Sequence, residues 1–237
     1  MITATYCYVA IARQNLIKKM MKLKRLFDVV ASLVGLLLIW WVFPLVAILI
    51  HWKMPGASAI FSQQRVGKDG KLFMCHKFRS MTAVHHGSSV SIAGESRITP
   101  LGAMLRRYKI DELPGLWDVL IGKMSFVGPR PDVPGYADML TGDDRKVLLM
   151  RPGITGPATL KYRAEEELIS QHVAQRIAEG DTRSEQEIAK DYNDNVIYPD
   201  KVRLNKYYYE HYSFAKDLQM IFATVLGYKI EYAGEWV

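Results

Sequence analysis

The pattern of apolar and polar positions changes abruptly near residue 29. Residues 29–50 form a run of 22 residues without a charged side chain. A straight helix of that length reaches about 33 Å, which is enough to cross a hydrocarbon core of about 30 Å. Soluble helices rarely stay apolar on all sides over such a length, and the run is too long for the core of a signal peptide. The pattern therefore predicts a membrane helix.

The basic residues on both sides of this run bear on its direction. Positive charge normally marks the cytoplasmic side of a membrane helix, so two basic flanks are expected if both ends lie at that side. Pro44 allows such a bend, because it removes a backbone donor and clashes with the carbonyl of Trp40. A re-entrant helix and a kinked spanning helix both fit these residues. The flanking charges are Arg13, Lys18, Lys19, Lys22, Lys24 and Arg25 before the run, and Lys53, Arg65, Lys68, Lys71, Lys77 and Arg79 after it.

The chain after the membrane run begins with a predicted β-hairpin. Apolar residues alternate on either side of a turn at residues 68–70. Residues 85–96 are rich in Gly, Ser and His and predict a loop. The adjacent His85 and His86 lack the spacing that places two metal ligands on one face, so a solvated loop is favoured over a metal site. Residues 122–135 and 151–157 are dense in Gly and Pro and predict rigid loops.

Helix signals occur at several later positions. Thr99 and Pro100 form a cap and a first helical residue, and Pro114 starts a second helix by forcing Leu113 out of the first. Further helices are expected near Glu165, at a capping box of Ser184 and Glu187, and after Lys201. Ser213 caps the last helix, which fits either a buried or an interfacial position. The predicted apolar stripes are Leu101, Met104, Leu105 and Tyr108 in the first helix, and Phe214, Leu218, Ile221, Phe222 and Val225 in the last.

Composition adds a charge argument to this picture. The 237 residues carry 31 Lys and Arg against 24 Asp and Glu, a formal net charge of +7. This balance predicts an anionic partner such as nucleic acid, anionic lipid or a phosphorylated small molecule. Cys7 and Cys75 are too few for a disulfide framework or a cysteine zinc site, and they favour a reducing compartment.

The adjacent acids Asp111 and Glu112 are the most suggestive chemical feature. They lie between two predicted helices, with Arg106 and Arg107 one turn earlier. Carboxylates at a helix start often serve only as caps or dipole partners. The positive end of the following helix and the two guanidinium groups would also keep an aspartate ionised near neutral pH. They would also bind a phosphate that the aspartate attacks. A second carboxylate could hold magnesium beside substrate phosphates.

Other basic residues could bind a phosphate. Arg130 lies between two prolines, which fix the backbone on both sides of a bidentate donor. Lys77 and Arg79 are two residues apart, so on a strand they emerge on the same face, where they could hold a diphosphate or simply edge the sheet.

These residues carry a resemblance to a known family. From Lys22 to about Gly227, the chain resembles the bacterial sugar transferases, also called monotopic phosphoglycosyl transferases, which start glycan assembly on a polyprenol phosphate. The stretches that match are KRLFDVVAS, FSQQRVGKDGKLF, HKFRSM, ITPLGAMLRRYKIDELPGLWDVLIGKMSFVGPRP, RPGITG and YSFAKDLQMIFATV. Their order and density make the resemblance specific.

The resemblance implies an α+β protein with a membrane helix bent at Pro44, and a small, mainly helical domain with a β-hairpin at the cytoplasmic face of the bacterial inner membrane. It implies magnesium-dependent transfer of a sugar phosphate from a UDP-sugar to undecaprenyl phosphate. Asp111 maps to the nucleophile, Glu112 to its partner at the metal, and Arg106, Lys77 and Arg130 to residues of family motifs. The expected organisation is an extension at 1–21, with Met20 or Met21 as alternative starts, a membrane helix at 22–54 and a catalytic domain at 55–237 that ends in an interfacial helix.

The sequence departs from the family pattern at a few places. Phe43 precedes Pro44 where many members have a serine that can satisfy a freed carbonyl. Gly115 and Asp118 stand where glutamine and asparagine are usual. Residues 172–195 have no counterpart in the smallest members.

The leading interpretation is a double displacement at Asp111, with Arg130, Arg106, Lys77 and Arg79 binding the substrate phosphates. UMP leaves in the first step, and undecaprenyl phosphate accepts the phosphosugar in the second. Anionic lipids are expected at the basic flanks, nucleic acid is not expected as a partner, and a homodimer is left open. The alternative is a membrane-tethered basic adaptor or nucleic-acid-binding module, although the basic residues are scattered and match no nucleic-acid motif.

Overall fold

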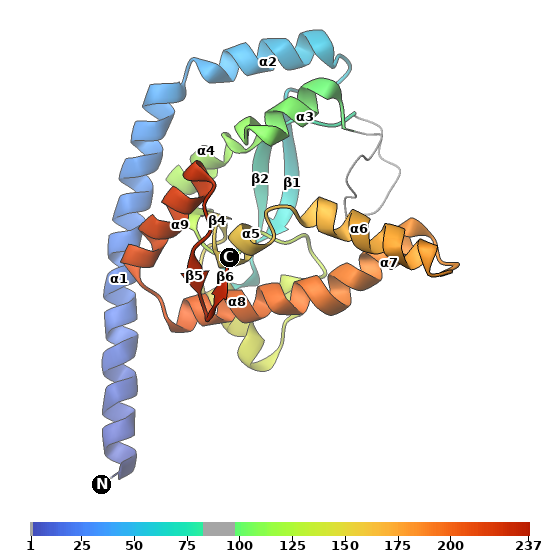
Figure 1. Ribbon diagram of the computed structural model, residues 1–237. Helices are drawn as coiled ribbons and strands as arrows, with labels where there is room; N and C mark the ends of the chain where they lie inside the picture. Colours follow the sequence, from blue (N-terminus) through green and yellow to red (C-terminus); the bar gives the residue numbers. More distant parts are fainter. Residues whose placement is uncertain (1, 83–97) are drawn as a thin grey trace.

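The computed structural model describes residues 2–82 and 98–237. A long first helix stands along one side of the molecule, a second helix crosses the top, and the rest of the chain packs between them (Figure 1). The loop predicted at 85–96, with His85 and His86, lies outside the described residues.

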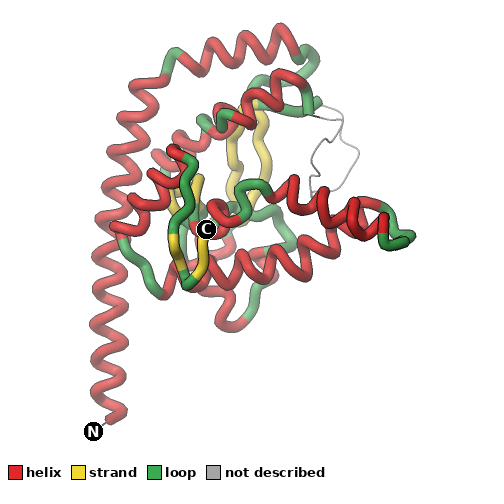
Figure 2. The backbone as a smooth tube through the Cα atoms, viewed as in Figure 1, coloured by secondary structure: helices red, strands yellow, loops and turns green. Residues whose placement is uncertain are grey.

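The apolar run forms two helices with a sharp bend between them (Figure 2). Helix α1 spans Ile2–Ile39 and α2 spans Val42–Lys53. Within the described chain no single helix is long and apolar enough to cross a membrane, but Met20–Ile39 and Val42–Lys53 together have the required length and composition, with a bend of 61°. Helix α1 includes residues 2–21 of the expected extension.

The bend lies at Trp40 and Trp41, just before Pro44 in the first turn of α2. Pro44 has no N–H to donate to the Trp40 carbonyl, which instead accepts from the Phe43 amide at 3.3 Å. The Trp41 indole Nε1 donates to the Leu38 carbonyl at 3.1 Å. An indole and a backbone amide thus satisfy two carbonyls at the break, where many family members carry a serine.

The predicted hairpin forms as β1, Ile60–Val66, and β2, Leu72–Phe78, paired antiparallel in the register Phe61 to Lys77 and Arg65 to Phe73. Its turn is a 3₁₀ segment at Lys68–Gly70. Helix α3 then spans Pro100–Arg107, capped by the Thr99 side chain. A 3₁₀ turn at Ile110–Glu112 and helix α4, Gly115–Leu120, follow it.

The prediction of loops at 122–135 and 151–157 is wrong in part, because each contains a strand. Strand β3, Ser125–Val127, pairs in parallel with β4, Gly153–Thr155. The two backbones approach so closely that a Cβ at Gly153 would lie 2.1 Å from the Gly128 nitrogen. The glycines that indicated a loop are therefore what permits this pairing.

The remaining chain is mostly helical. Two 3₁₀ segments, Ala137–Met139 and Gly142–Leu149, precede it. The capping box at Ser184 and Glu187 forms as predicted, and the helix expected after Lys201 begins three residues earlier, after a π turn at Asn193–Ile197. The elements are α5 at Pro157–Lys161, α6 at Glu165–Ala178, α7 at Glu185–Tyr192, α8 at Tyr198–Glu210, α9 at Phe214–Leu226, and a closing hairpin of β5, Glu231–Tyr232, and β6, Glu235–Trp236.

Two of the predicted apolar stripes are not the buried faces. In α9 the structure buries Asp217, Met220 and Ala223 and leaves Phe222 and Val225 exposed. This face is buried because the Asp217 carboxylate binds Lys24, Tyr208 and Tyr212 inside the domain. In α3, Leu105 is buried, whereas Met104 and Tyr108 of the predicted stripe are exposed.

Both halves of the bent pair are attached to the same domain. At the start, Lys24 pairs with Asp217 at 2.6 Å, and the Arg25 guanidinium donates to the last carbonyls of α4. Asp28 accepts from the Ser125 hydroxyl and the Phe126 amide, each at 3.1 Å. These contacts give the KRLFD stretch a structural role, which is to dock α1 on α4, β3 and α9.

The second helix of the bent pair, α2, packs on the same domain through its C-terminal half. Val46, Ile50 and Met54 are buried in one cluster with Phe78 of β2 and Leu105 of α3. Ile110 and Leu113, which flank the acidic pair, pack against the same cluster. The second half of the apolar run therefore supports the segment that carries Asp111 and Glu112.

Candidate active site

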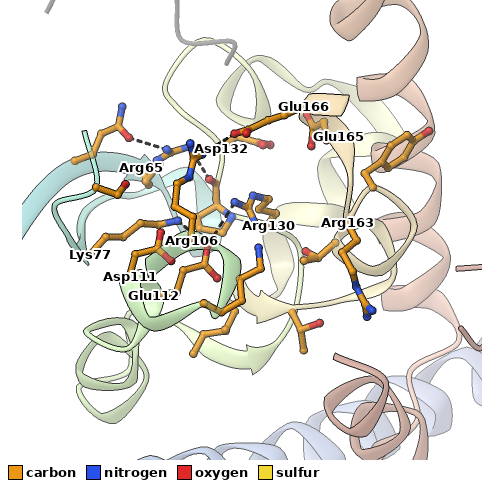
Figure 3. A pocket seen from close by; sticks show the side chains of 18 of the residues that line it. Arg65, Lys77, Arg106, Asp111, Glu112, Arg130, Asp132, Arg163, Glu165 and Glu166 are labelled. Atoms are coloured by element: carbon orange, nitrogen blue, oxygen red, sulfur yellow. Dashed lines mark hydrogen bonds and ion pairs between the residues drawn. The ribbon is translucent and has the colours of Figure 1, made fainter. Parts of the chain in front are cut away.

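Asp111 and Glu112 lie on the 3₁₀ turn between α3 and α4, at the edge of a cavity of about 1330 Å³. The chain reaches this turn through Lys109, whose φ of 56° is left-handed. A non-glycine residue in that region is uncommon and marks a locally constrained turn. The turn directs both carboxyl groups into the cavity together with cationic side chains from other elements (Figure 3).

The structure brings three of the predicted residues together around Glu112. The Lys77 ammonium of β2 lies 2.8 Å from Glu112 Oε1, and Arg130 Nη2 lies 3.6 Å from the same oxygen. Burial opposes ionisation of Glu112, but Lys77 and Arg130 outweigh it and lower its pKa to about 2. Glu112 is therefore a carboxylate at any physiological pH, and Lys77 and Arg130 are held at the acidic pair.

Asp111 has a different environment, although it is the adjacent residue. It is 6% exposed, and its buried Oδ1 has no hydrogen-bond partner. Burial and then the Glu112 carboxylate raise the pKa of Asp111, while Lys77, Lys109 and Arg106 oppose the rise. The cationic field expected from the sequence is present, but burial outweighs it. The result is a poorly hydrated, unpartnered oxygen on a residue that lines the cavity.

Arg106 lines the same cavity but has a partner that the sequence did not indicate. Its Nη2 lies 2.5 Å from Glu166 at the start of α6, while its Nη1 is buried without a hydrogen-bond partner. Glu165, the preceding residue, pairs with Lys201 of α8 at 2.6 Å. The predicted phosphate-binding arginine thus keeps one free donor in the cavity.

Arg79 does not accompany Lys77, contrary to the prediction that they share a strand face. Strand β2 ends at Phe78, and the Arg79 guanidinium donates to the Met54 carbonyl after α2. Its side chain is buried, and its backbone amide donates to Ala59 at 2.8 Å. The observed contacts of Arg79 link α2 to the hairpin, while its Nε stays unpartnered at the cavity.

Several cavity residues were not singled out from the sequence, among them Arg65, Asp132 and Tyr198. Arg65 donates to the Pro131 carbonyl at 3.1 Å and so holds the loop that carries Arg130. The Tyr198 hydroxyl lies 3.4 Å from the Asp132 carboxylate. The only sequence signal for Arg65 is the hairpin alternation, and Asp132 and Tyr198 come from segments that the sequence does not connect.

Asp132 provides a pH-dependent test of this geometry. Burial raises its pKa to about 6, against the opposing charges of Lys201 and Arg65. Because the native state holds this proton more tightly than the unfolded chain does, Asp132 lowers stability progressively as the pH rises from about 4 to about 6, and the loss is constant above that. We expect Asp132→Asn to increase the free energy of unfolding at pH 7.5 by up to about 3 kcal/mol and to have little effect near pH 4. Urea unfolding in detergent at both pH values measures this, and a gain that is equal at both would contradict it.

The structure also explains why Asp118 can stand where the family usually has an asparagine. Its carboxylate is fully buried and accepts from the His76 amide at 2.9 Å and pairs with the His76 Nδ1 at 2.7 Å. An asparagine offers only one acceptor oxygen to these two groups. Asp118 thus joins α4 to β2 beside Lys77. At Gly115 an added Cβ would meet only ordinary contacts with Ile154, so the structure does not require glycine there.

The acidic pair could accept a magnesium ion only with help from substrate oxygens. Among the residues that the structure describes, no group of three His, Cys, Asp or Glu side chains is placed to hold a metal. Carboxylate oxygens such as those of Asp111 and Glu112 suit a hard cation, and magnesium usually takes few carboxylates together with phosphates and water. The donor set therefore fits magnesium that arrives with a diphosphate.

Comparisons with known proteins identify the family. The sequence model of the bacterial sugar transferases matches residues 18–229. A Bacillus subtilis (strain 168) protein, provisionally named an undecaprenyl-phosphate N-acetylgalactosaminyl 1-phosphate transferase, is 38% identical over 60% of this chain and 79% of its own length. The undecaprenyl-phosphate galactose phosphotransferase of Salmonella typhimurium is 36% identical over 61% of this chain.

A third relative is the UDP-N-acetylgalactosamine-undecaprenyl-phosphate N-acetylgalactosaminephosphotransferase of Aeromonas hydrophila, which is 35% identical over 59% of this chain. The chain covers only 34% of the length of the Aeromonas relative and 34% of the length of the Salmonella relative. The resemblance found in the sequence is therefore confirmed, and an enzyme is favoured over a basic adaptor. This chain belongs to the bacterial sugar transferase family and is an enzyme of the phosphoglycosyl transferase class.

Proposed function

We propose that this enzyme transfers a sugar phosphate from a UDP-sugar to undecaprenyl phosphate at the cytoplasmic face of the bacterial inner membrane. The observation that carries the proposal is the convergence of Asp111, Glu112, Lys77, Arg106 and Arg130 on one cavity (Figure 3). An unpartnered carboxylate oxygen beside two guanidinium groups and an ammonium suits attack on a diphosphate. The names of the relatives give the donor and acceptor classes.

The reaction has two displacements. Asp111 Oδ1 attacks the sugar-proximal phosphorus, its bond to the UMP oxygen breaks, and UMP leaves. A phosphate oxygen of undecaprenyl phosphate then attacks the phosphorus of the aspartyl phosphosugar, which releases the Asp111 carboxylate and the polyprenyl diphosphate sugar. The poor hydration of Asp111 favours its action as a nucleophile, and Arg130 and the free Arg106 donor bind the phosphoryl oxygens.

Glu112 and Lys77 hold this arrangement in place. Because the pKa of Glu112 is lowered to about 2, it stays an anion that orients Lys77 and Arg130. Asp111 and Glu112 would hold magnesium together with the donor diphosphate, and the ion would neutralise charge that develops on the leaving UMP.

The attachment of α1 and α2 supports a re-entrant arrangement of the apolar run. Lys24, near the beginning of the run, pairs with Asp217 of α9, and Met54, just after α2, is buried in the cluster with Phe78 and Leu105. A helix that crossed the membrane would carry one of these ends away from the domain. The exposed Leu38, Trp40 and Trp52 would then contact lipid.

This topology predicts the accessibility of engineered cysteines. In a background without Cys7 and Cys75, cysteines at the exposed positions Lys22 and Lys68 should react with a membrane-impermeant maleimide only from the cytoplasmic side. A cysteine at Leu38, which is 69% exposed near the bend, should be protected from both sides until detergent is added. Reaction at Lys22 or Lys68 from the periplasmic side would show that the helix spans.

Arg130 offers a test of the phosphate site. Arg130→Ala should lower UMP release at least about 30-fold, because a positioned charge-assisted contact in the transition state is worth about 2 to 3 kcal/mol. Arg130→Lys should recover only part of the rate, since lysine lacks the planar fork. Release of UMP from UDP-galactose and UDP-N-acetylgalactosamine by the detergent-solubilised enzyme with magnesium measures this.

The matched control is Arg145→Ala, which removes an exposed arginine outside the cavity. It should leave the rate unchanged. Full activity in Arg130→Lys would mean that Arg130 acts only through its charge, and absence of UMP release from every UDP-sugar by the wild-type enzyme would overturn the proposed function.

A further inference from the structure

The unpartnered polar atoms of the protein gather in one place. Six buried side-chain nitrogen or oxygen atoms among the described residues have no hydrogen-bond partner, and all but the Tyr232 hydroxyl belong to residues that line the cavity of the acidic pair. Buried polar groups are normally satisfied, so such a concentration calls for a ligand that completes it. Arg106 Nη1 and Asp111 Oδ1 belong to the reaction already described.

Two of the remaining atoms lie on a different wall. Thr159 Oγ1 belongs to α5 and Asn205 Oδ1 to α8, and these two helices pack against each other. On α8, Tyr198 and Lys201 lie on the same face as Asn205, at helical spacings of seven and four residues. All four residues line the cavity, and we refer to them as the α5–α8 wall.

The α5–α8 wall is joined to the reaction centre by a short loop. Arg130 contacts Glu112 at 3.6 Å, and Asp132, two residues later, receives the Tyr198 hydroxyl at 3.4 Å. Two residues span at most about 7 Å of chain. The Tyr198 end of the wall therefore lies beside the loop that carries Arg130, and Asn205 lies about 10 Å further along α8.

The atoms without partners also indicate the chemistry of the group that the wall would bind. Asn205 Oδ1 is an acceptor, Thr159 Oγ1 can accept as well as donate, and Asp132 supplies a carboxyl group nearby. Such a set calls for a ligand rich in O–H donors. The hexose ring of the donor carries three or four free hydroxyl groups, whereas the uridine offers one uracil N–H and two ribose hydroxyls, so the wall suits the sugar better than the nucleoside.

We propose that the α5–α8 wall is the subsite that binds the sugar hydroxyls of the donor, with Asn205 and Thr159 as residues that set sugar affinity. This inference rests on the proposed function, because it takes a sugar diphosphate as the ligand. Side chains that hydrogen-bond a hydroxyl in a buried site also reject sugars that lack it or direct it elsewhere.

Binding to the catalytically blocked protein tests this assignment without turnover. In an Asp111→Asn background, isothermal titration calorimetry with UDP and with UDP-galactose, UDP-N-acetylgalactosamine and UDP-glucose identifies the tightest donor. Thr159→Val and Asn205→Leu should each weaken binding of that donor about tenfold and change the affinity for UDP less than twofold. Asn205→Ala, which adds no bulk, should behave like Asn205→Leu.

Stability gives a second readout that a structural role would not produce. Because Thr159 Oγ1 and Asn205 Oδ1 have no partner to lose, Thr159→Val and Asn205→Leu should not lower the melting temperature of the free protein. Tyr232→Phe is the matched control, since it removes the unpartnered hydroxyl outside the cavity and should alter neither binding constant.

The outcomes separate the two proposals. Equal weakening of UDP and donor would assign the wall to the nucleotide and overturn the inference, as would unchanged donor binding in both variants. Failure of the wild-type protein to bind UDP with magnesium, together with failure of the Asp111→Asn protein to bind every UDP-sugar, would overturn the proposed function, and the sugar subsite with it.

Discussion

Replacement of Asp111 by asparagine is expected to reduce UMP release at least about 1000-fold, which is the scale of losing a nucleophile. Wild-type enzyme incubated with its UDP-sugar and magnesium, without polyprenol phosphate, should release one equivalent of UMP and gain a phosphosugar on the peptide that contains Asp111. The adduct should be labile to hydroxylamine, as expected for an acyl phosphate. An amide is a poor nucleophile, so Asp111→Asn should form no adduct in mass spectrometry.

Glu112→Gln is the matched control, because it alters the neighbouring carboxylate and leaves Asp111 intact. It should lower the rate and still yield the adduct at Asp111, since Glu112 holds Lys77 and Arg130 and does not attack. An adduct in Asp111→Asn, or UMP release that requires both substrates, would favour direct transfer in a ternary complex and reject Asp111 as the nucleophile.

The second large effect concerns the docking of α1. Lys24 is 6% exposed, and its ammonium lies 2.6 Å from Asp217, whose carboxylate also accepts from the Tyr208 hydroxyl at 2.5 Å and the Tyr212 hydroxyl at 3.1 Å. Lys24→Met should lower the free energy of unfolding by about 3 to 5 kcal/mol, because it leaves a buried carboxylate without its counter-charge. Urea unfolding in detergent micelles measures this loss.

Two further variants define that result. Lys22→Met removes an exposed lysine two residues earlier in α1 and should change stability by less than about 0.5 kcal/mol. Adding Asp217→Leu to Lys24→Met should recover only part of the loss, since it removes the uncompensated charge but leaves the Tyr208 and Tyr212 hydroxyls without this acceptor. A loss below about 1 kcal/mol in Lys24→Met alone would show that the ion pair does not hold α1 in place.

Local features of the structure could be predicted from the sequence because they depend on nearby residues. The hairpin follows from its alternation and turn, and the helix starts at Thr99 and Ser184 follow from their capping side chains. The family resemblance assigned Lys77 and Arg130 to one substrate site with the acidic pair, but neither the resemblance nor their spacing along the chain indicated that both contact Glu112.

Contacts between residues that are far apart in the sequence could not be predicted from local patterns. Arg106 meets Glu166, which is 60 residues away, and Arg79 turns toward Met54 because β2 ends one residue before it. In α9 the hydropathy pattern left a buried and an interfacial position open. The buried ion pair of Asp217 with Lys24 turns the opposite side of the helix inward, so the apolar stripe is not the packed face, and the interfacial position stays a prediction. Tertiary contacts of this kind override local propensity.

The ion pair between Lys24 and Asp217 joins residues that are 193 positions apart. At a synthesis rate of about 5 to 20 residues per second, Asp217 is added roughly 10 to 40 s after Lys24. The apolar surface of α1 thus leaves the ribosome long before the helix on which it docks exists. We expect this surface to meet lipid first, so that the nascent chain is committed to the bilayer before its catalytic domain can fold around the helix.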